Sequence, residues 1–315
     1  MPLTPARTQE LAAALEKIMH GSGGLSTLRG SHDPFHALVH NYYLPVFAWV
    51  DDIYNNTPQP PTRHHCVVLG ISCVQGGGKT TMTKYLEKLF RHTGKKCATV
   101  SIDDVYYPRQ QQLSIAAANA GNPLLEMRGN PGTHDIKLLL DLIKRAKDGK
   151  DVTIPRYDKS AHNGLGDRAP KDKWIFHQGP LDILLVEGWC LGFEASKRCP
   201  ANPHLVPINE ALREFTSIYN ELDAMLVVQV GDAKWVYKWR EEAEADMRAE
   251  GKPAMTPAQV RDFVDRFMPT YDEYLEPFYD SMTSPSAPAT TLSTKRRMVA
   301  AIDSTRSCVF MQDFS

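Results

Sequence analysis

A run of glycines followed by a lysine and two hydroxyl side chains is the segment of this sequence whose chemistry is easiest to interpret. It consists of Gln75, Gly76, Gly77, Gly78, Lys79, Thr80 and Thr81. Glycines let successive backbone N–H groups turn toward one bound anion without Cβ clashes, and the N-terminus of a following helix adds partial positive charge. Lys79 would reach the β- and γ-phosphates of ATP, and the Thr80 hydroxyl would ligate Mg²⁺. The segment therefore predicts a site for ATP and Mg²⁺.

The segment departs from the usual phosphate-loop pattern at one position. The pattern G-x-x-x-x-G-K-[ST] has a glycine five residues before Gly78, and this chain has Cys73 there. A glycine-rich turn with an incidental lysine is the alternative, and the apolar run before it and the helical pattern after it favour phosphate binding. Cys73 also raises the question of redox sensitivity, because helix N-termini lower the pKa of thiols.

Acidic residues follow two other apolar runs. Asp103 and Asp104 come directly after Ile102, and Glu187 directly follows the apolar run 184–186. In an open α/β sheet, ligands bind at the carboxyl ends of the strands, so a carboxylate there can take a proton from an attacking hydroxyl. A buried Glu187 would be stabilised by Mg²⁺ and its waters. A helix N-cap for either aspartate, and a salt bridge for the glutamate, remain open as alternatives.

The pattern of apolar runs predicts the elements that position these groups. Short β-branched runs indicate strands over 66–72, 97–102, 181–186, 224–230 and, more weakly, 298–302. Helical patterns lie between most of them, which predicts an α/β fold with a P-loop NTPase-like parallel sheet covered by helices on both faces. Apolar spacing near Leu11 and over 36–54, before a proline-rich stretch, predicts a helical extension over residues 1–62 and a main domain over 63–315.

Composition excludes several classes of protein. The chain has 315 residues, 42% of them hydrophobic, and a net charge of -1. This balance disfavours a disordered chain and a dedicated binder of nucleic acid or anionic membranes. Every apolar run is far shorter than the roughly 20 residues of a membrane span, and neither a signal peptide nor a transit peptide is visible. The six cysteines lack zinc spacing, so we expect a soluble cytoplasmic protein in a reducing compartment.

Seven segments together carry a family resemblance. They are Gly70–Ser72 with Gln75–Thr81, Asp103–Tyr106, Arg128–Asp135, Pro155–Ser160, Glu187–Trp189, Trp235–Arg240 and Phe263–Pro269. The chain resembles the D-glycerate 3-kinases of plants and fungi, within the phosphoribulokinase/uridine kinase branch of P-loop kinases. The resemblance spans roughly residues 65 to 310, and its long middle motifs are more specific than the phosphate loop. Cys73 in place of the first loop glycine fits this group.

The resemblance implies an activity. D-glycerate would be phosphorylated on its 3-hydroxyl by ATP with Mg²⁺, giving 3-phosphoglycerate and ADP, the closing step of photorespiration in plants and of serine or glycerate salvage elsewhere. It implies that Lys79 and Glu187 are catalytic, that Asp103 is the catalytic base, and that Thr80, Asp103 and Glu187 ligate the metal. Asp104 remains the alternative base, and a plastid is the alternative location for a chain trimmed of its transit peptide.

A three-carbon carboxylate acceptor requires a fixed cation, preferably an arginine with its bidentate fork, and partners for the 2-hydroxyl. The candidates are Arg128, His134, Arg156, Tyr157, Asp158, Lys159 and Arg168. Which arginine faces the carboxylate remains open.

A helix over 234–248 is expected to form a lid, within 232–252. Arg240 would bind the phosphates when the lid closes and excludes water, although an ordinary exposed helix is the alternative. We expect a monomer without nucleic-acid partners. Competing functions are a kinase for uridine, pantothenate or another small metabolite, and an ATP-binding protein without turnover.

Overall fold

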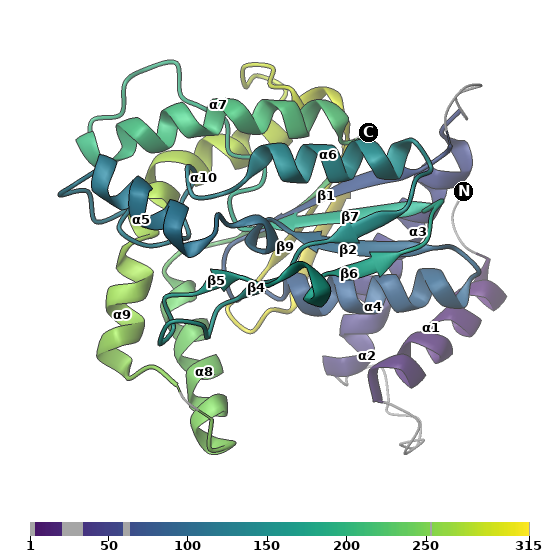
Figure 1. The fold of residues 1–315 in the computed structure, drawn as a ribbon. Coiled ribbons are helices and arrows are strands. Elements are labelled where there is room, and N and C mark those ends of the chain that lie inside the picture. Colours follow the sequence, from purple (N-terminus) through teal and green to yellow (C-terminus); the bar gives the residue numbers. More distant parts are fainter. Residues whose placement is uncertain (1–3, 21–33, 59–63, 253, 315) are drawn as a thin grey trace.

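A six-stranded sheet runs through the protein in the order β10-β9-β8-β1-β7-β2 (Figure 1). The computed structural model describes residues 4–20, 34–58, 64–252 and 254–314. Neighbouring strands are parallel, except that β10 is antiparallel to β9. The strands are β1 Val67–Cys73, β2 Cys97–Ser101, β7 Ile183–Gly188, β8 Ala224–Val230, β9 Arg296–Ile302 and β10 Cys308–Asp313.

All five predicted strands are present, and the predicted α/β fold with a mostly parallel sheet is confirmed. The central strands β1 and β7 are buried along their whole length, which explains why their sequences are continuous apolar runs without alternation. The edge strand β10 was not predicted, because Cys308–Asp313 is partly exposed and follows a tight turn.

Helices cover both faces of the sheet (Figure 1). On one face, α4 Lys79–His92 contacts β1, β2 and β7, and α1 Pro5–His20 and α3 Leu44–Asn56 lie against α4. On the other face, α6 Ile136–Lys147 contacts α7 Val206–Glu221, and α10 Met268–Thr283 contacts β8 and β9. The remaining elements are α2 Pro34–Leu38, η1 Val39–Tyr43, η2 Ile102–Val105, α5 Arg109–Ala118, β3 Val152–Ile154, β4 Tyr157–Asp158, β5 Asp167–Arg168, η3 Lys171–Lys173, β6 Ile175–His177, η4 Pro203–Leu205, α8 Trp235–Ala249, α9 Pro257–Asp265 and η5 Leu292–Thr294.

The N-terminal helices share the hydrophobic core of the sheet. Leu11 and Leu15 of α1 are buried, and the ring of Phe47 in α3 lies 4.5 Å from that of Phe90 in α4. Apolar burial against α4 therefore stabilises the helical extension. The border predicted between residues 62 and 63 lies outside the described residues, and the division into two domains stays a prediction.

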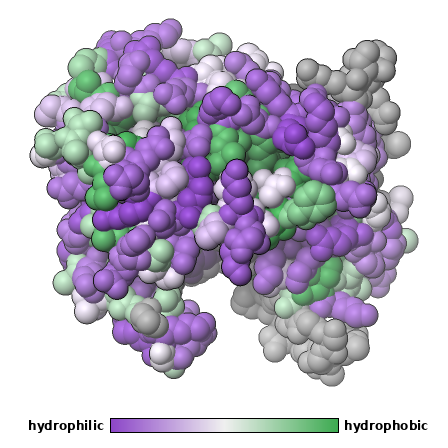
Figure 2. Space-filling view, in the orientation of Figure 1, coloured by the Kyte–Doolittle hydropathy of each residue, from purple (hydrophilic) through white to green (hydrophobic). Residues whose placement is uncertain are grey.

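Helix α8 confirms the helix predicted over 234–248. Together with α9 it projects from the body of the protein, and the two helices contact each other (Figure 1). Hydrophilic side chains cover most of the face drawn in Figure 2. In the described part of the chain, no helix is both long enough and apolar enough to span a membrane.

Candidate active site

The predicted phosphate loop connects β1 to α4. Gly76 and Gly78 have φ angles of 80° and 92°, which residues with a Cβ rarely adopt. Lys79, the first residue of α4, curls back so that its Nζ donates to the carbonyl oxygens of Cys73 at 2.8 Å and Val74 at 3.2 Å. The loop thus has the backbone shape, the helix N-terminus and the lysine that a bound phosphate requires.

The remaining loop residues differ in their environments. The backbone N–H of Gln75 donates to the hydroxyl of Tyr271 in α10 at 3.1 Å, which anchors the loop to the far face of the sheet. Thr81 is exposed in the first turn of α4. A Cβ on Gly77 would lie 2.2 Å from the Sγ of Cys73, so the cysteine side chain fills the space that this glycine leaves.

Cys73 is buried at the end of β1, and burial raises the pKa of its thiol to about 11. The thiolate is the reactive form of cysteine, so the protonated, inaccessible thiol argues against redox sensing here. All six cysteines are free, and four of them are buried.

Glu187 lies at the carboxyl end of β7, between the ends of β1 and β2. Only 4% of it is exposed, and its Oε1 accepts a hydrogen bond of 3.1 Å from the Thr80 hydroxyl. Burial raises the pKa of Glu187, and the nearby Lys79 opposes that effect. The cost of burying this carboxylate is what a bound cation would remove.

The oxygens of Thr80 and Glu187 fit Mg²⁺, which takes oxygen ligands and usually keeps several waters. The described residues contain no group of three His, Cys, Asp or Glu side chains arranged to hold a metal ion by themselves. This combination suits a metal held by one or two protein groups together with nucleotide phosphates.

Asp103 follows β2 in the short helix η2, at the same carboxyl edge of the sheet as Glu187. Its Oδ2 accepts a hydrogen bond of 2.5 Å from Nζ of Lys159, and its Oδ1 accepts one of 2.8 Å from the Tyr106 hydroxyl. Burial alone would raise the pKa of Asp103, but Lys159 and the hydroxyl together hold it well below the usual range. Asp103 is therefore ionised and oriented by two donors.

Asp104 has a different position. Its Oδ2 accepts a 3.1 Å hydrogen bond from the backbone N–H of Ser101, as part of a capping box at η2, and a 2.9 Å hydrogen bond from Arg156. Burial raises its pKa, and the guanidinium opposes that effect. The N-cap of η2 is Ser101, so neither aspartate is the N-cap that the sequence left open, and Asp104 takes part in the capping box from position N3.

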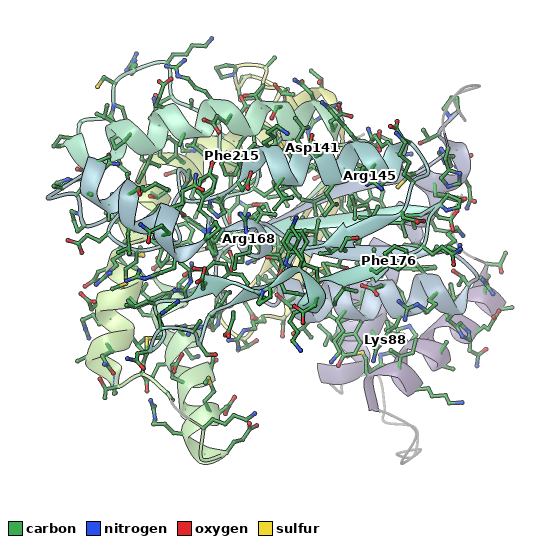
Figure 3. All side chains as sticks on the ribbon, viewed as in Figure 1. Lys88, Asp141, Arg145, Arg168, Phe176 and Phe215 are labelled. Carbon is green, nitrogen blue, oxygen red and sulfur yellow. The ribbon has the colours of Figure 1, made fainter. Side chains whose placement is uncertain are left out.

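His134 is 2% exposed, and neither ring nitrogen has a hydrogen-bond partner among the described residues. Its ring lies 4.5 Å from that of Tyr106 and contacts Phe215 of α7 edge-on at 5.9 Å (Figure 3 labels Phe215). Burial lowers the pKa of His134 to about 4, so the ring is neutral at physiological pH. Because a buried, unpartnered polar group costs free energy, a hydrogen-bonding ligand would stabilise this side chain.

The three candidate arginines are engaged with the protein itself. Arg128 donates to the carbonyl oxygens of Gly164 at 3.1 Å and Lys159 at 3.3 Å, and also to that of Leu165. Arg168 (Figure 3) donates to the carbonyl of Tyr106 at 2.8 Å and pairs with Asp135 at 3.2 Å. With Arg156 bound to Asp104, these guanidinium groups shape the loops around Asp103.

The structure separates Tyr157 from Asp158, its neighbour in the sequence. The Tyr157 ring lies 5.2 Å from that of Tyr106, edge to face, and beneath the guanidinium of Arg128 at 5.2 Å. Asp158 is exposed and accepts hydrogen bonds from Ser160, so it forms a turn in the loop. Tyr157 therefore lies in the cluster around Asp103, and Asp158 does not join it.

Among the described residues, Arg240 forms its ion pair and its ring contact within α8 and α9, and not with the phosphate loop. It pairs with the buried Glu244 at 2.5 Å and lies over the ring of Phe263 at 5.2 Å. Trp239 of α8 does contact the loop, because a Cβ on Gly76 would lie 2.7 Å from the Trp239 Cβ.

Sequence reasoning missed two residues. The first is Tyr106, whose hydroxyl donates to Asp103 and orients its carboxylate. Tyr106 follows Asp103 by three positions, about one helical turn, and that spacing could have indicated a contact between the two side chains. Arg306 donates to the Gly76 carbonyl across 230 positions, and no local pattern in the sequence indicates that contact.

Comparison with known proteins gives consistent matches. A family described as phosphoribulokinase/uridine kinase matches residues 68–199. The chain is 39% identical over 269 residues to the chloroplastic D-glycerate 3-kinase of Arabidopsis thaliana, which covers 81% of this chain and 58% of that protein. It is 30% identical to the uncharacterized kinase mug58 of Schizosaccharomyces pombe, over 69% of this chain and 84% of that protein.

A solved structure agrees with these matches. The D-glycerate 3-kinase from Cryptococcus neoformans has a TM-score of 0.73 at 28% identity, covering 91% of this chain and 100% of that one. The present chain spans 58% of the length of the Arabidopsis protein. From its motifs, its fold and these relatives, the chain belongs to the phosphoribulokinase/uridine kinase family of P-loop kinases, as the resemblance predicted.

Proposed function

We propose that the protein transfers the γ-phosphoryl group of ATP to the 3-hydroxyl of D-glycerate, giving 3-phosphoglycerate and ADP. The observation that carries the proposal is the ion pair between Asp103 and Lys159 at 2.5 Å. Asp103 lies at the carboxyl edge of the sheet, where the phosphate loop also lies. The pair supplies a carboxylate for a reacting hydroxyl and a cation for an acidic acceptor. Two relatives named as D-glycerate 3-kinases support this choice of acceptor.

On the donor side, the phosphate loop binds the β- and γ-phosphates through its backbone N–H groups and the N-terminus of α4. Lys79 exchanges the carbonyl oxygens of Cys73 and Val74 for phosphate oxygens, which the stronger charge of phosphate favours. Thr80 and Glu187 would hold Mg²⁺, which, when bound, neutralises charge on the phosphates. We assign Asp103 to the proton rather than to the metal, because both of its oxygens already face donors.

On the acceptor side, Asp103 accepts the proton of the 3-hydroxyl as that oxygen attacks, while the Tyr106 hydroxyl keeps the carboxylate oriented. Lys159 binds the carboxylate of the acceptor, since it is the candidate cation whose charge faces the site. The unpartnered ring of His134 hydrogen-bonds the 2-hydroxyl. Arg128 acts indirectly, by holding the loop that carries Lys159.

The lid remains part of the proposal. Helix α8 projects beside the phosphate loop and touches it through Trp239, so a rotation of α8 would cover the nucleotide and exclude water. Arg240 would have to leave Glu244 to reach a phosphate.

The remaining assignments are also proposals. We propose a monomer, because the site described here is built from one chain, and no nucleic-acid partner, because the net charge is -1. The Arabidopsis relative is a chloroplastic enzyme, so we propose cytoplasm or plastid as the location. The corresponding roles are glycerate salvage and photorespiration.

An ATP-consumption assay with five acceptors tests the function. The acceptors are D-glycerate, L-glycerate, uridine, pantothenate and ribulose 5-phosphate, each with MgATP. We expect turnover with D-glycerate, detected as ADP and as 3-phosphoglycerate by mass spectrometry. Turnover with uridine or pantothenate and none with glycerate would overturn the proposal, and ADP binding without turnover on any acceptor would favour a non-catalytic nucleotide-binding protein.

A further inference from the structure

Arg306 lies in the turn between β9 and β10, in an unusual backbone conformation. Its φ is 67°, in the left-handed region that arginine rarely adopts. The carboxylate of Asp303 stabilises the turn by accepting hydrogen bonds from the backbone N–H groups of Thr305 at 2.8 Å and Ser307 at 3.0 Å.

The guanidinium of Arg306 joins two distant parts of the protein. Its Nε donates to the carbonyl oxygen of Gly76 in the phosphate loop at 2.7 Å, and its Nη1 donates to Glu242 of α8 at 2.9 Å. The group also lies over the ring of Trp239 at 5.0 Å, within cation–π distance. One side chain thus contacts the phosphate loop and two residues of α8.

Trp239 completes the connection. Its Nε1 donates to the carbonyl oxygen of Ser304 at 2.9 Å, and its Cβ lies against Gly76, where any side chain would collide. The phosphate loop, α8 and the β9–β10 turn therefore meet around one arginine and one tryptophan. The side chain of Arg306 is 35% exposed, so it lies at the surface of this junction and not in the hydrophobic core.

We propose that Arg306 is a positioning residue for nucleotide binding, which holds the phosphate loop in its anion-binding shape and couples it to α8. A guanidinium bound to the Gly76 carbonyl limits rotation of that peptide, so less conformational entropy is lost when phosphates bind. Because Arg306 also bonds to Glu242, a movement of α8 would shift the guanidinium and with it the hydrogen bond to the phosphate loop. The inference rests on the proposed function only in taking ATP as the phosphoryl donor.

The central variant is Arg306→Gly. Glycine accepts the positive φ at no steric cost, so this change removes the side chain without straining the turn. We expect the Kd for ADP, measured by calorimetry, and the KM for ATP to rise roughly tenfold, as for loss of a charge-assisted hydrogen bond. The KM for D-glycerate should be unchanged, and the Tm should be unchanged or higher.

Two further variants make the test specific. Glu242→Gln breaks the ion pair with α8 but leaves the bond to Gly76, so it should raise the Kd for ADP in the same direction by a smaller factor. Arg306→Lys should restore only part of the affinity, because an ammonium cannot form both directional bonds and the stack. Arg213→Ala, which removes an exposed cation paired with Glu210 on α7, is the matched control and should bind ADP like the wild type.

Wild-type affinity for ADP in Arg306→Gly would overturn the inference. So would an equal rise in both KM values together with a lower Tm, because that pattern indicates a purely structural contact. If Arg306→Gly does not fold, Glu242→Gln decides, and unchanged ADP binding there is the negative result. Should the wild type fail to phosphorylate D-glycerate, the ADP measurements still test Arg306, so failure of the two proposals is distinguishable.

Discussion

The carboxylate of Asp103 and the ammonium of Lys159 lie 2.5 Å apart, although 56 positions separate them in the sequence. Asp103 comes from the end of β2, and Lys159 comes from the loop after β4 that Arg128 holds in place. Under the proposed function, the base for the acceptor hydroxyl and the cation for the acceptor carboxylate are therefore adjacent. This is the arrangement expected for an acceptor that carries both groups on a short carbon chain.

Replacing Asp103 by asparagine should reduce kcat by roughly two or more orders of magnitude, because the amide cannot accept the proton. The Kd for ADP should remain near the wild-type value. The comparison is Asp104→Asn, which weakens the capping box and the pair with Arg156. This variant should have a lower Tm than the wild type but a smaller loss of kcat than Asp103→Asn. Steady-state kinetics and thermal denaturation distinguish the two, and a larger kcat loss in Asp104→Asn would reverse the assignment.

Lys159→Met should raise the KM for D-glycerate roughly tenfold or more, because the cation that meets the acceptor carboxylate is lost. The KM for ATP should change little. Lys171→Met removes an exposed lysine from the following loop and serves as the control, with both KM values unchanged. Equal KM values for D-glycerate in the two variants would show that another cation binds the carboxylate.

The stability of the protein should depend on pH through His134. Burial lowers the pKa of its ring from 6.5 to about 4, so the unfolded chain binds a proton that the folded protein does not. Stability must therefore fall as the pH drops through this window, by about 2 kcal/mol between pH 7 and pH 5. His134→Gln cannot titrate and should lose that much less stability than the wild type over the same range. Urea denaturation at the two pH values measures the difference, and parallel losses would contradict the prediction.

A double-mutant cycle tests the contact between Cys73 and Gly77. Gly77→Ala places a Cβ 2.2 Å from the cysteine Sγ and should lower both Tm and ADP affinity. Adding Cys73→Gly removes the sulfur and should restore part of each, with a coupling energy of at least about 1 kcal/mol. Gly76→Ala, which collides with Trp239 at a φ of 80°, should not be rescued by Cys73→Gly. Additive effects of the first two changes would show that the contact carries no free energy.

Most of the central sheet, and the groups at its carboxyl edge, can be predicted from the sequence alone. The central strands β1 and β7 are nearly continuous apolar runs, and the phosphate loop, the two aspartates and Glu187 follow the apolar residues of β1, β2 and β7, respectively. These features are local, because strand ends and loop glycines are set by residues a few positions away. Five strands of the six-stranded sheet, the helix at α8 and the family could therefore be predicted, whereas the partly exposed β10 could not.

Which side chains lie together at the site depends instead on the tertiary fold. Sequence could not separate Asp103 from Asp104, because one turn of backbone directs them to different partners. Nor could it show that the arginines expected to bind substrate are bound to loop carbonyls and acids, leaving Lys159 beside Asp103. The contact of Arg306 with Gly76 joins two ends of the domain that meet only after the sheet has formed. Periodicity in a sequence records which face of an element is buried, whereas the partner of a polar side chain depends on distances that folding alone creates.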